Sequence, residues 1–276
     1  MLQQGQINTN TALTNWSVDN QKTIVSEKMW YWAGAKAMNL IAGARLQMDV
    51  VRRATLPPGP KILAANHPTT IDPFLMLTLL PEQISILVTG GVFNVPLIGS
   101  CIRRGGHVPV VRGEGREAYE RAKRLLESGR SIGIFPEGAL SVLNGAQARS
   151  RTGAARLSMS TGAPVIPLGI SLDQKRIRYI NLPENGKSIE ARYYARGPYA
   201  ITIGKQLYFH GDVDDRELVN STTERIMQCI TQLSLESADR IKTSTHKTYQ
   251  PYIRPRLIEG GQRPVFQAIR SGYRDV

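Results

Sequence analysis

Long apolar runs and clustered metal ligands are scarce in this 276-residue sequence. No run of about 18 uncharged apolar residues occurs, so the sequence predicts no membrane-spanning helix. The two cysteines, Cys101 and Cys229, are far apart and lack metal-type spacing, which argues against a disulfide framework and fits a reducing compartment. The four histidines are too scattered to predict a zinc site. We therefore expect neither a structural metal nor a disulfide-stabilised fold.

Acidic residues are also few, since 22 Asp and Glu stand against 35 Lys and Arg, and the formal net charge is +13. Such an excess favours an anionic partner, either nucleic acid or the anionic face of a membrane. We expect the membrane surface and no nucleic-acid partner, because the sequence contains neither a helix-turn-helix nor an RNA-binding signature. A basic surface without a dedicated partner is the alternative.

Four regions are expected along the chain. Polar residues 1–22 predict a flexible amino-terminal segment, and residues 23–54 predict a helical segment with its helix over 24–51. Two interpretations of that helix stay open, namely a helix lying in the membrane interface and an ordinary core helix. Residues 55–242 predict one α/β domain, and residues 243–276 a basic flexible tail.

Strand-like apolar runs alternate with helical segments within the α/β domain. This order predicts a mostly parallel sheet flanked by helices. The expected strands are residues 61–65, 84–88, 107–111, 131–135, 165–170 and 200–203. The expected helices are residues 74–80, 116–128, 154–160 and 217–235. Residues 181–198, with several Pro and Gly and one Asn-Gly pair, predict a long loop.

The most informative segment reads Asn-His-Pro-Thr-Thr-Ile-Asp over residues 66–72 and directly follows a buried-strand pattern. His67 and Asp72 would point in different directions on a helix or a strand, so they can meet only where the backbone turns. Pro68 and Pro73 favour such a turn. Either His67 is a general base whose ring is held by Asp72, or Asp72 simply caps a helix that begins at Pro73. The two interpretations are compatible, because a carboxylate has two oxygens.

This segment resembles the first sequence block of the glycerolipid acyltransferase family, whose best-known members are the PlsC-like lysophosphatidic acid acyltransferases. Later blocks occur in the same order. Residues 106–112, Gly-His-Val-Pro-Val-Val-Arg, resemble the second block; residues 135–138, Phe-Pro-Glu-Gly, the third; and residues 163–168 the fourth. Four ordered blocks over most of the chain are a specific signal.

The resemblance implies an O-acyltransferase in which His67 deprotonates an acceptor hydroxyl and Asp72 supports the histidine. The hydroxyl attacks an acyl thioester, acyl-CoA or an acylated carrier protein, so no metal or bound cofactor is implied. The favoured acceptor is a lysolipid, 1-acyl-glycerol-3-phosphate, at the cytoplasmic inner face of the membrane; another lysolipid or a glycolipid is the alternative. The implied substrate-binding residues are Asn66, Arg112, Glu137 and Gly138, with Arg112 assigned to the acceptor's phosphate and Asn66 to positioning the loop or the substrate.

One departure from the family pattern concerns the acceptor. The third block usually continues as Thr-Arg-Ser, whereas this chain has Ala-Leu-Ser at residues 139–141. The missing arginine is one that helps to bind the acceptor's phosphate. Arg112 remains, and Arg149, Arg151 and Arg156 are possible substitutes. The departure also motivates an alternative in which the protein binds lipid without catalysis.

A dinucleotide-binding pattern is the strongest competing motif. Gly113-Glu114-Gly115 and Ala118 fit Gly-x-Gly-x-x-Ala between a strand and a helix, which would suggest a nicotinamide-dependent oxidoreductase. Pro109 within the strand and Glu114 between the glycines disfavour this interpretation. A serine hydrolase is disfavoured too, because no Gly-x-Ser-x-Gly elbow occurs. Without a protein nucleophile, the expected reaction is direct transfer to the acceptor.

Overall fold

The structure is a computed structural model that describes residues 9–111, 113–141, 150–184, 187–243 and 256–257. Its strands are β1 (Leu46–Arg52), β2 (Ile62–Ala65), β3 (Ile84–Thr89), β4 (Val108–Val110), β5 (Ser131–Ile134), β6 (Val165–Leu172), β7 (Arg178–Glu184), β8 (Lys187–Tyr193), β9 (Gly197–Ile203) and β10 (Arg256–Leu257). Its helices are α1 (Thr9–Arg45), α2 (Asp72–Met76), α3 (Ile98–Arg104), α4 (Gly115–Glu127), α5 (Gly153–Thr161) and α6 (Arg216–Thr243), with short 3₁₀ helices at Gly90–Asn94 and Gln174–Arg176.

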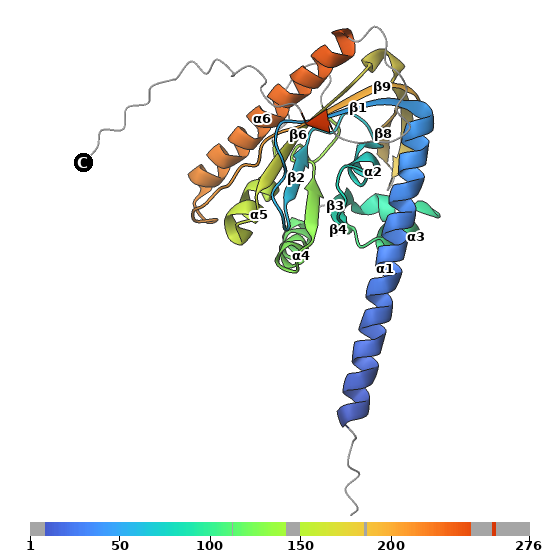
Figure 1. Cartoon of the computed structure of the whole chain (residues 1–276), viewed down its shortest axis with the longest axis vertical. Coiled ribbons are helices and arrows are strands. Elements are labelled where there is room, and N and C mark those ends of the chain that lie inside the picture. Colours follow the sequence, from blue (N-terminus) through green and yellow to red (C-terminus); the bar gives the residue numbers. More distant parts are fainter. Residues whose placement is uncertain (1–8, 112, 142–149, 185–186, 244–255, 258–276) are drawn as a thin grey trace, which may run out of the picture.

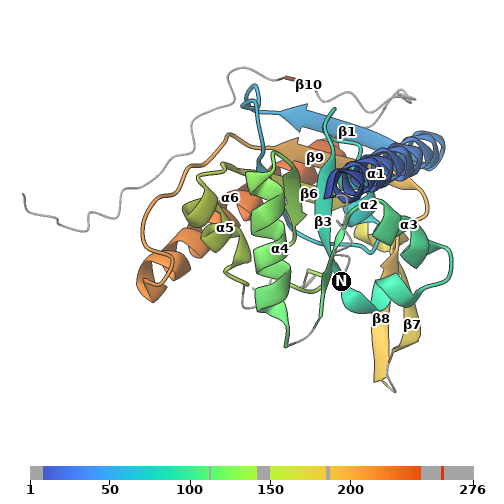
Figure 2. The same ribbon diagram turned by 90° about the horizontal axis from the view of Figure 1, so that it is seen from below.

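Eight strands form one mixed sheet in the order β10-β1-β9-β6-β2-β5-β3-β4, with helices on both of its faces (Figure 1 and Figure 2). The pairs from β6 through β2, β5 and β3 to β4 are all parallel, whereas β9 is antiparallel to β6. The predicted α/β fold with a mostly parallel sheet is therefore confirmed. The six predicted strands and four predicted helices of the domain are present, with shifted ends.

Two apolar clusters hold the layers together, one on each face of the sheet. Strand β2 contributes to both, since Leu63 and Ala65 face the cluster under α1 and α2, while Ile62 and Ala64 face the cluster under α4, α5 and α6. Because both faces of β2 are covered, its four residues are all buried and apolar, as in parallel sheets generally. The central position of β2 places the residues that follow it at the middle of one sheet edge.

Helix α1 extends well beyond the body of the protein (Figure 1). Its carboxyl-terminal half packs on the sheet through Tyr31, Ala35 and Ala42. The Tyr31 hydroxyl accepts a hydrogen bond from the Ile84 N–H at 3.1 Å, which joins α1 to the start of β3. No helix in the described part of the chain is both long and apolar enough to cross a membrane.

The amino-terminal expectations need correction. Residues 9–22 belong to α1, so the flexible segment predicted over 1–22 is wrong for that part, and residues 1–8 lie outside the description. The helix expected over 24–51 ends at Arg45, and residues 46–52 form β1, which pairs with β9 inside the sheet. The sheet domain thus begins before residue 55. No residue separates helix from strand here, and the only signals for the helix end are Gly43 and Arg45 in its last turn.

A second correction concerns residues 181–198, which are not a loop. Strands β7 and β8 pair as an antiparallel hairpin apart from the main sheet, and β9 begins at Gly197 (Figure 2). Only Asn185 and Gly186 separate the two strands, and Asn-Gly is the dipeptide that two-residue hairpin turns prefer. These two residues lie outside the description. In the tail predicted to be flexible, Arg256–Leu257 pairs with β1.

Candidate active site

His67 and Asp72 meet on the turn that follows β2. The His67 Nδ1 lies 3.0 Å from the Asp72 Oδ2, so the predicted reversal of the backbone between them is confirmed. The capping interpretation is wrong by one residue, because α2 begins at Asp72 and Ile71 is its N-cap. The pair lies at the carboxyl end of a central parallel strand, which is where open α/β sheets hold their ligands.

The Asp72 carboxylate is buried and accepts four hydrogen bonds. Its Oδ2 accepts from the His67 ring and, at 2.7 Å, from the Thr69 N–H. Its Oδ1 accepts from the Thr69 hydroxyl and, at 2.7 Å, from the Tyr199 hydroxyl on β9. Burial, reinforced by the nearby Asp72 charge, raises the pKa of Tyr199 well above its usual value, so the phenol keeps the proton that it donates. The carboxylate is thus fixed in one orientation.

This arrangement sets the tautomer of His67. An ionised carboxylate can only accept, so Nδ1 carries the proton that faces Asp72 and Nε2 keeps a free lone pair. The ring stacks on Phe135 with centroids 4.2 Å apart and planes 25° from parallel, which holds it against rotation. The His67 side chain is 17% exposed, whereas that of Asp72 is 0% exposed. An external hydroxyl can therefore approach the base while the supporting acid stays shielded.

The turn after β5 is bonded to the turn after β2. Ser141 and His67 exchange two hydrogen bonds of 2.8 Å: the His67 N–H donates to the Ser141 Oγ, and the Ser141 N–H donates to the His67 carbonyl. The Ser141 hydroxyl also donates to the Glu137 carboxylate at 2.8 Å. Burial raises the pKa of Glu137, although this hydrogen bond and the His67 amide oppose the shift. Glu137 therefore lies beside His67.

Gly138 and Asn66 have positions that explain their residue types. Gly138 adopts a φ of +66°, and a Cβ there would lie 3.0 Å from the Arg151 Cγ, so glycine suits both the backbone and the packing. The Asn66 amide donates to the Ile170 carbonyl at 2.9 Å and accepts from the Ile170 N–H at 2.7 Å. The Asn66 side chain thereby adds two hydrogen bonds to β6 directly after the β2–β6 pairing.

The candidate phosphate-binding arginines divide into three groups. Arg112 and Arg149 lie outside the described residues. Arg156 donates to the Val213 carbonyl on the approach to α6, so it is committed elsewhere. Arg151 packs against Gly138 and remains beside the site.

Arg192 was missed by the sequence analysis. It lies on β8, and its guanidinium donates to the Ser141 carbonyl. Its main chain exchanges hydrogen bonds with Thr70, at 3.0 Å from the Thr70 N–H to the Arg192 carbonyl and at 3.1 Å from the Arg192 N–H to the Thr70 Oγ1. The Asn-Gly pair was the one available signal for this hairpin.

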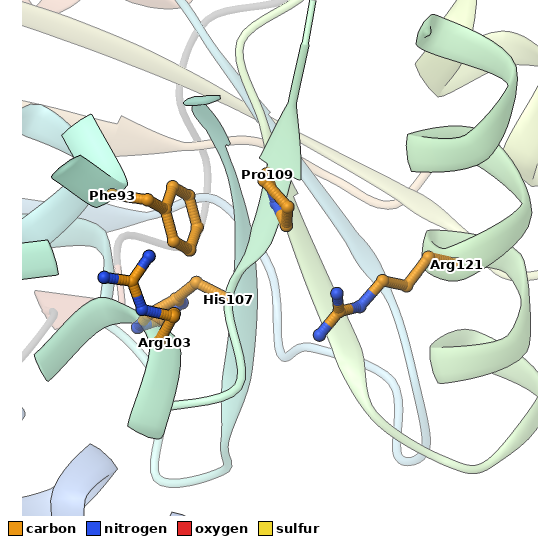
Figure 3. Close-up of a pocket in the computed structure, with 5 residues that line it drawn as sticks. All are labelled: Phe93, Arg103, His107, Pro109 and Arg121. Atoms are coloured by element: carbon orange, nitrogen blue, oxygen red, sulfur yellow. The ribbon is translucent and has the colours of Figure 1, made fainter. Parts of the chain in front are cut away.

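A separate pocket lies against the edge strand β4 (Figure 3). Its volume is about 210 Å³, and it is lined by Phe93, Arg103, His107, Pro109 and Arg121. Burial, reinforced by the positive charge of Arg130, lowers the pKa of His107 to about 4, and the His107 Nδ1 accepts from the Ile86 N–H. The pocket is smaller than the roughly 300–1,000 Å³ typical of ligand sites and contains neither His67 nor Asp72.

The dinucleotide-binding pattern falls at this same edge of the sheet. The glycines do link β4 to α4, but β4 is an outermost strand of the sheet. Dinucleotides bind at the crevice where the strand order reverses, inside the sheet. The described residues also contain no group of three His, Cys, Asp or Glu that could hold a metal ion.

The site thus combines a histidine–carboxylate pair at the carboxyl end of a parallel strand with a Phe-Pro-Glu-Gly turn beside it. A family model described as Acyltransferase matches residues 47–171. The chloroplastic 1-acyl-sn-glycerol-3-phosphate acyltransferases of Brassica napus and Arabidopsis thaliana are each 30% identical over 112 residues, which is 40% of this chain. The matches cover 32% and 31% of those proteins, so the chain spans about a third of their length.

Two further comparisons agree. The 1-acyl-sn-glycerol-3-phosphate acyltransferase of Saccharomyces cerevisiae is 27% identical over 139 residues, covering 49% of this chain and 45% of the yeast protein. The crystal structure of PlsC, the LPA acyltransferase of Thermotoga maritima, has the same fold, with a TM-score of 0.53 and 18% identity over 83% of this chain and 85% of that one. Residues 47–171 thus match the Acyltransferase family model, and the chain shares the fold of PlsC.

Proposed function

We propose that the protein transfers a fatty acyl group from a thioester to a lysolipid hydroxyl, with His67 as the general base. The His67 Nε2 removes the hydroxyl proton while the oxygen attacks the thioester carbonyl carbon. The C–S bond then breaks, the ester forms, and the protonated ring returns the proton to the departing thiolate. The observation that carries this proposal is the 3.0 Å contact between His67 Nδ1 and a fully buried carboxylate, which leaves Nε2 as the base.

The favoured acceptor is 1-acyl-glycerol-3-phosphate, which would yield phosphatidic acid, and the donor is acyl-CoA or an acylated carrier protein. The plant and yeast relatives are 1-acyl-sn-glycerol-3-phosphate acyltransferases, which supports this acceptor. The direct test incubates purified protein with radiolabelled acyl-CoA and a panel of lysolipids and glycolipids. Label in phosphatidic acid supports the proposal. Label in another lipid would assign a different acceptor, and no transfer to any acceptor would favour a lipid-binding protein.

Arg112→Ala is expected to weaken use of the phosphate-bearing acceptor. A guanidinium can bind two phosphate oxygens, and its loss removes charged hydrogen bonds that are each worth roughly 1.5–3 kcal/mol. The acceptor KM should therefore rise about tenfold or more, while the KM for acyl-CoA stays nearly constant. Initial-rate measurements with each substrate varied in turn check this. An unchanged acceptor KM would assign the phosphate to another arginine.

We further propose that the protein works peripherally at the cytoplasmic inner face of an anionic membrane. Support comes from the net charge of +13 and from apolar side chains exposed on α1, with Met29 62%, Leu40 76% and Ile41 53% exposed. Replacing these three by Gln should lower cosedimentation with phosphatidylglycerol vesicles about tenfold or more. The control is Leu235→Gln, which removes a side chain of similar exposure, 61%, from α6 on the other face. Equal partitioning of the triple variant and this control would refute the proposal.

A further inference from the structure

We infer that Arg192 supplies the phosphate-binding cation that the family pattern places at position 140, where this chain has leucine. This inference rests on the proposed function and names a residue of the same site. It starts from the contact between the Arg192 guanidinium and the carbonyl of Ser141, the residue directly after Leu140. The arginine thus reaches, from a distant hairpin, the segment that lacks its own.

The hairpin directs Arg192 towards the site. Residues opposite each other in an antiparallel pair share a face, and neighbours along a strand point to opposite faces. Arg192 pairs with Tyr179, and its side chain is 12% exposed. Arg178 pairs with Tyr193 in the adjacent register, so it projects from the other face and is exposed. The two arginines therefore lie on opposite faces of one hairpin, and Arg192 is the more buried of them.

Two hydrogen bonds hold the Arg192 side chain in place and leave other N–H groups of its guanidinium available. Its Nε donates to the Glu190 carboxylate at 2.9 Å, and its Nη1 donates to the Ser141 carbonyl. A guanidinium carries five N–H groups, and no other hydrogen bond from it is found within the described ranges. The remaining N–H groups form part of a planar fork that matches two phosphate oxygens. Because the main chain is bonded to Thr70, this fork is fixed relative to the catalytic turn.

Two carboxylates near His67 disfavour a bound phosphate unless a cation lies close to it. Asp72 and Glu137 both lie beside His67, and their carboxylates repel a phosphate dianion. Arg156 is bonded to Val213, and Arg151 is exposed with its stem over Gly138. Arg192, by contrast, is mostly buried, where a cation interacts with an anion more strongly than at the surface.

The test compares Arg192→Gln with Arg178→Gln, which removes the same charge from the opposite face of the same hairpin. The readouts are the KM for 1-acyl-glycerol-3-phosphate, the KM for acyl-CoA, and the Ki of sn-glycerol 3-phosphate as a competitor of the acceptor. For Arg192→Gln we expect the acceptor KM and this Ki to rise about tenfold or more, with the acyl-CoA KM unchanged. For Arg178→Gln we expect all three to stay within about twofold of wild type.

Adding Leu140→Arg to Arg192→Gln returns the guanidinium to the family's usual position. We expect this double variant to recover most of the lost acceptor affinity. If Arg192 only stabilised the segment around Ser141, no such recovery would be expected. The inference is wrong if Arg192→Gln lowers kcat while the acceptor KM and the Ki stay unchanged. It is also wrong if Arg178→Gln raises the acceptor KM and the Ki as much as Arg192→Gln does. If the Gln variant fails to fold, Arg192→Lys replaces it, because lysine keeps the positive charge but lacks the planar guanidinium. An unchanged acceptor KM and Ki in Arg192→Lys would contradict binding of the phosphate by the planar guanidinium. Failure of the wild-type protein to use the acceptor would instead overturn the proposed function.

Discussion

His67→Ala is expected to lower the acyl-transfer rate by roughly 10²–10⁴-fold, the usual contribution of a positioned general base. In that variant the acceptor hydroxyl faces no group able to take its proton. Folding should change little, because the His67 main chain carries the two bonds to Ser141 and the side chain is near the surface. Initial rates with saturating acyl-CoA and acceptor measure the effect.

Asp72→Asn should also cause a large loss, for a reason that the hydrogen bonds specify. Oδ2 accepts from the Thr69 backbone N–H, which can never act as an acceptor, so the amide oxygen must take that position, where it also accepts from the His67 Nδ1–H. The amide nitrogen then faces the Thr69 and Tyr199 hydroxyls, which can rotate and accept. The tautomer of His67 is kept, but the negative charge that stabilises the protonated ring is lost. The rate should fall about 10²-fold or more.

The matched control for both variants is His210→Ala, an exposed histidine in a loop outside the His67 network. Its activity should equal that of the wild type. Thermal unfolding of all three variants separates loss of chemistry from loss of structure. Near wild-type turnover in either His67→Ala or Asp72→Asn, in a folded protein, would remove the mechanism.

Gly169→Ala is expected to have the largest effect on stability. Gly169 lies in β6 directly beneath α6, and a Cβ there would be 2.1 Å from both the Leu233 carbonyl carbon and the Ser234 nitrogen. Both are backbone atoms, so no side-chain rotation can relieve the clash. The Gly169 carbonyl also accepts from the Ser237 hydroxyl at 2.8 Å, which would be disturbed if the helix moved away. We expect the free energy of unfolding to fall by about 3 kcal/mol, the upper end for overpacked cores.

The control is Gly34→Ala in α1, where an added Cβ meets nothing within 4 Å. Replacing a helical glycine by alanine should raise the free energy of unfolding by roughly 1 kcal/mol. Urea denaturation of the two variants therefore should show opposite shifts of the midpoint. A Gly169→Ala protein as stable as the wild type would show that α6 is not seated on β6 at this point.

Local patterns predicted the parts of the site that depend on local sequence. The apolar run before Asn66 predicted β2, and Pro68 and Pro73 predicted the turn that brings His67 to Asp72. Pairing of β2 with β5 then explains why the third block reaches the first, since parallel neighbours end at the same edge of a sheet.

The distant partners could not be predicted in this way. Tyr199 contacts Asp72 across 127 positions of sequence, and Arg192 contacts Ser141 across 51. Neither belongs to a motif, and both depend on how β9 and the hairpin fold back. The hairpin itself was missed because its Gly and Pro suggested a loop, although Asn-Gly between two strands has the opposite meaning. Strand β1 was missed because it follows α1 without a break.

The position of β9 also limits how the chain can be shortened. The sheet order places β9 between β6 and β1, so residues 197–203 separate two strands that both belong to the matched region 47–171. A fragment ending at residue 171 would leave β1 without the neighbour that joins it to β6, and would strip the buried acid of its phenol donor. We therefore expect a fragment limited to the family-matched region to fold less stably than the whole chain.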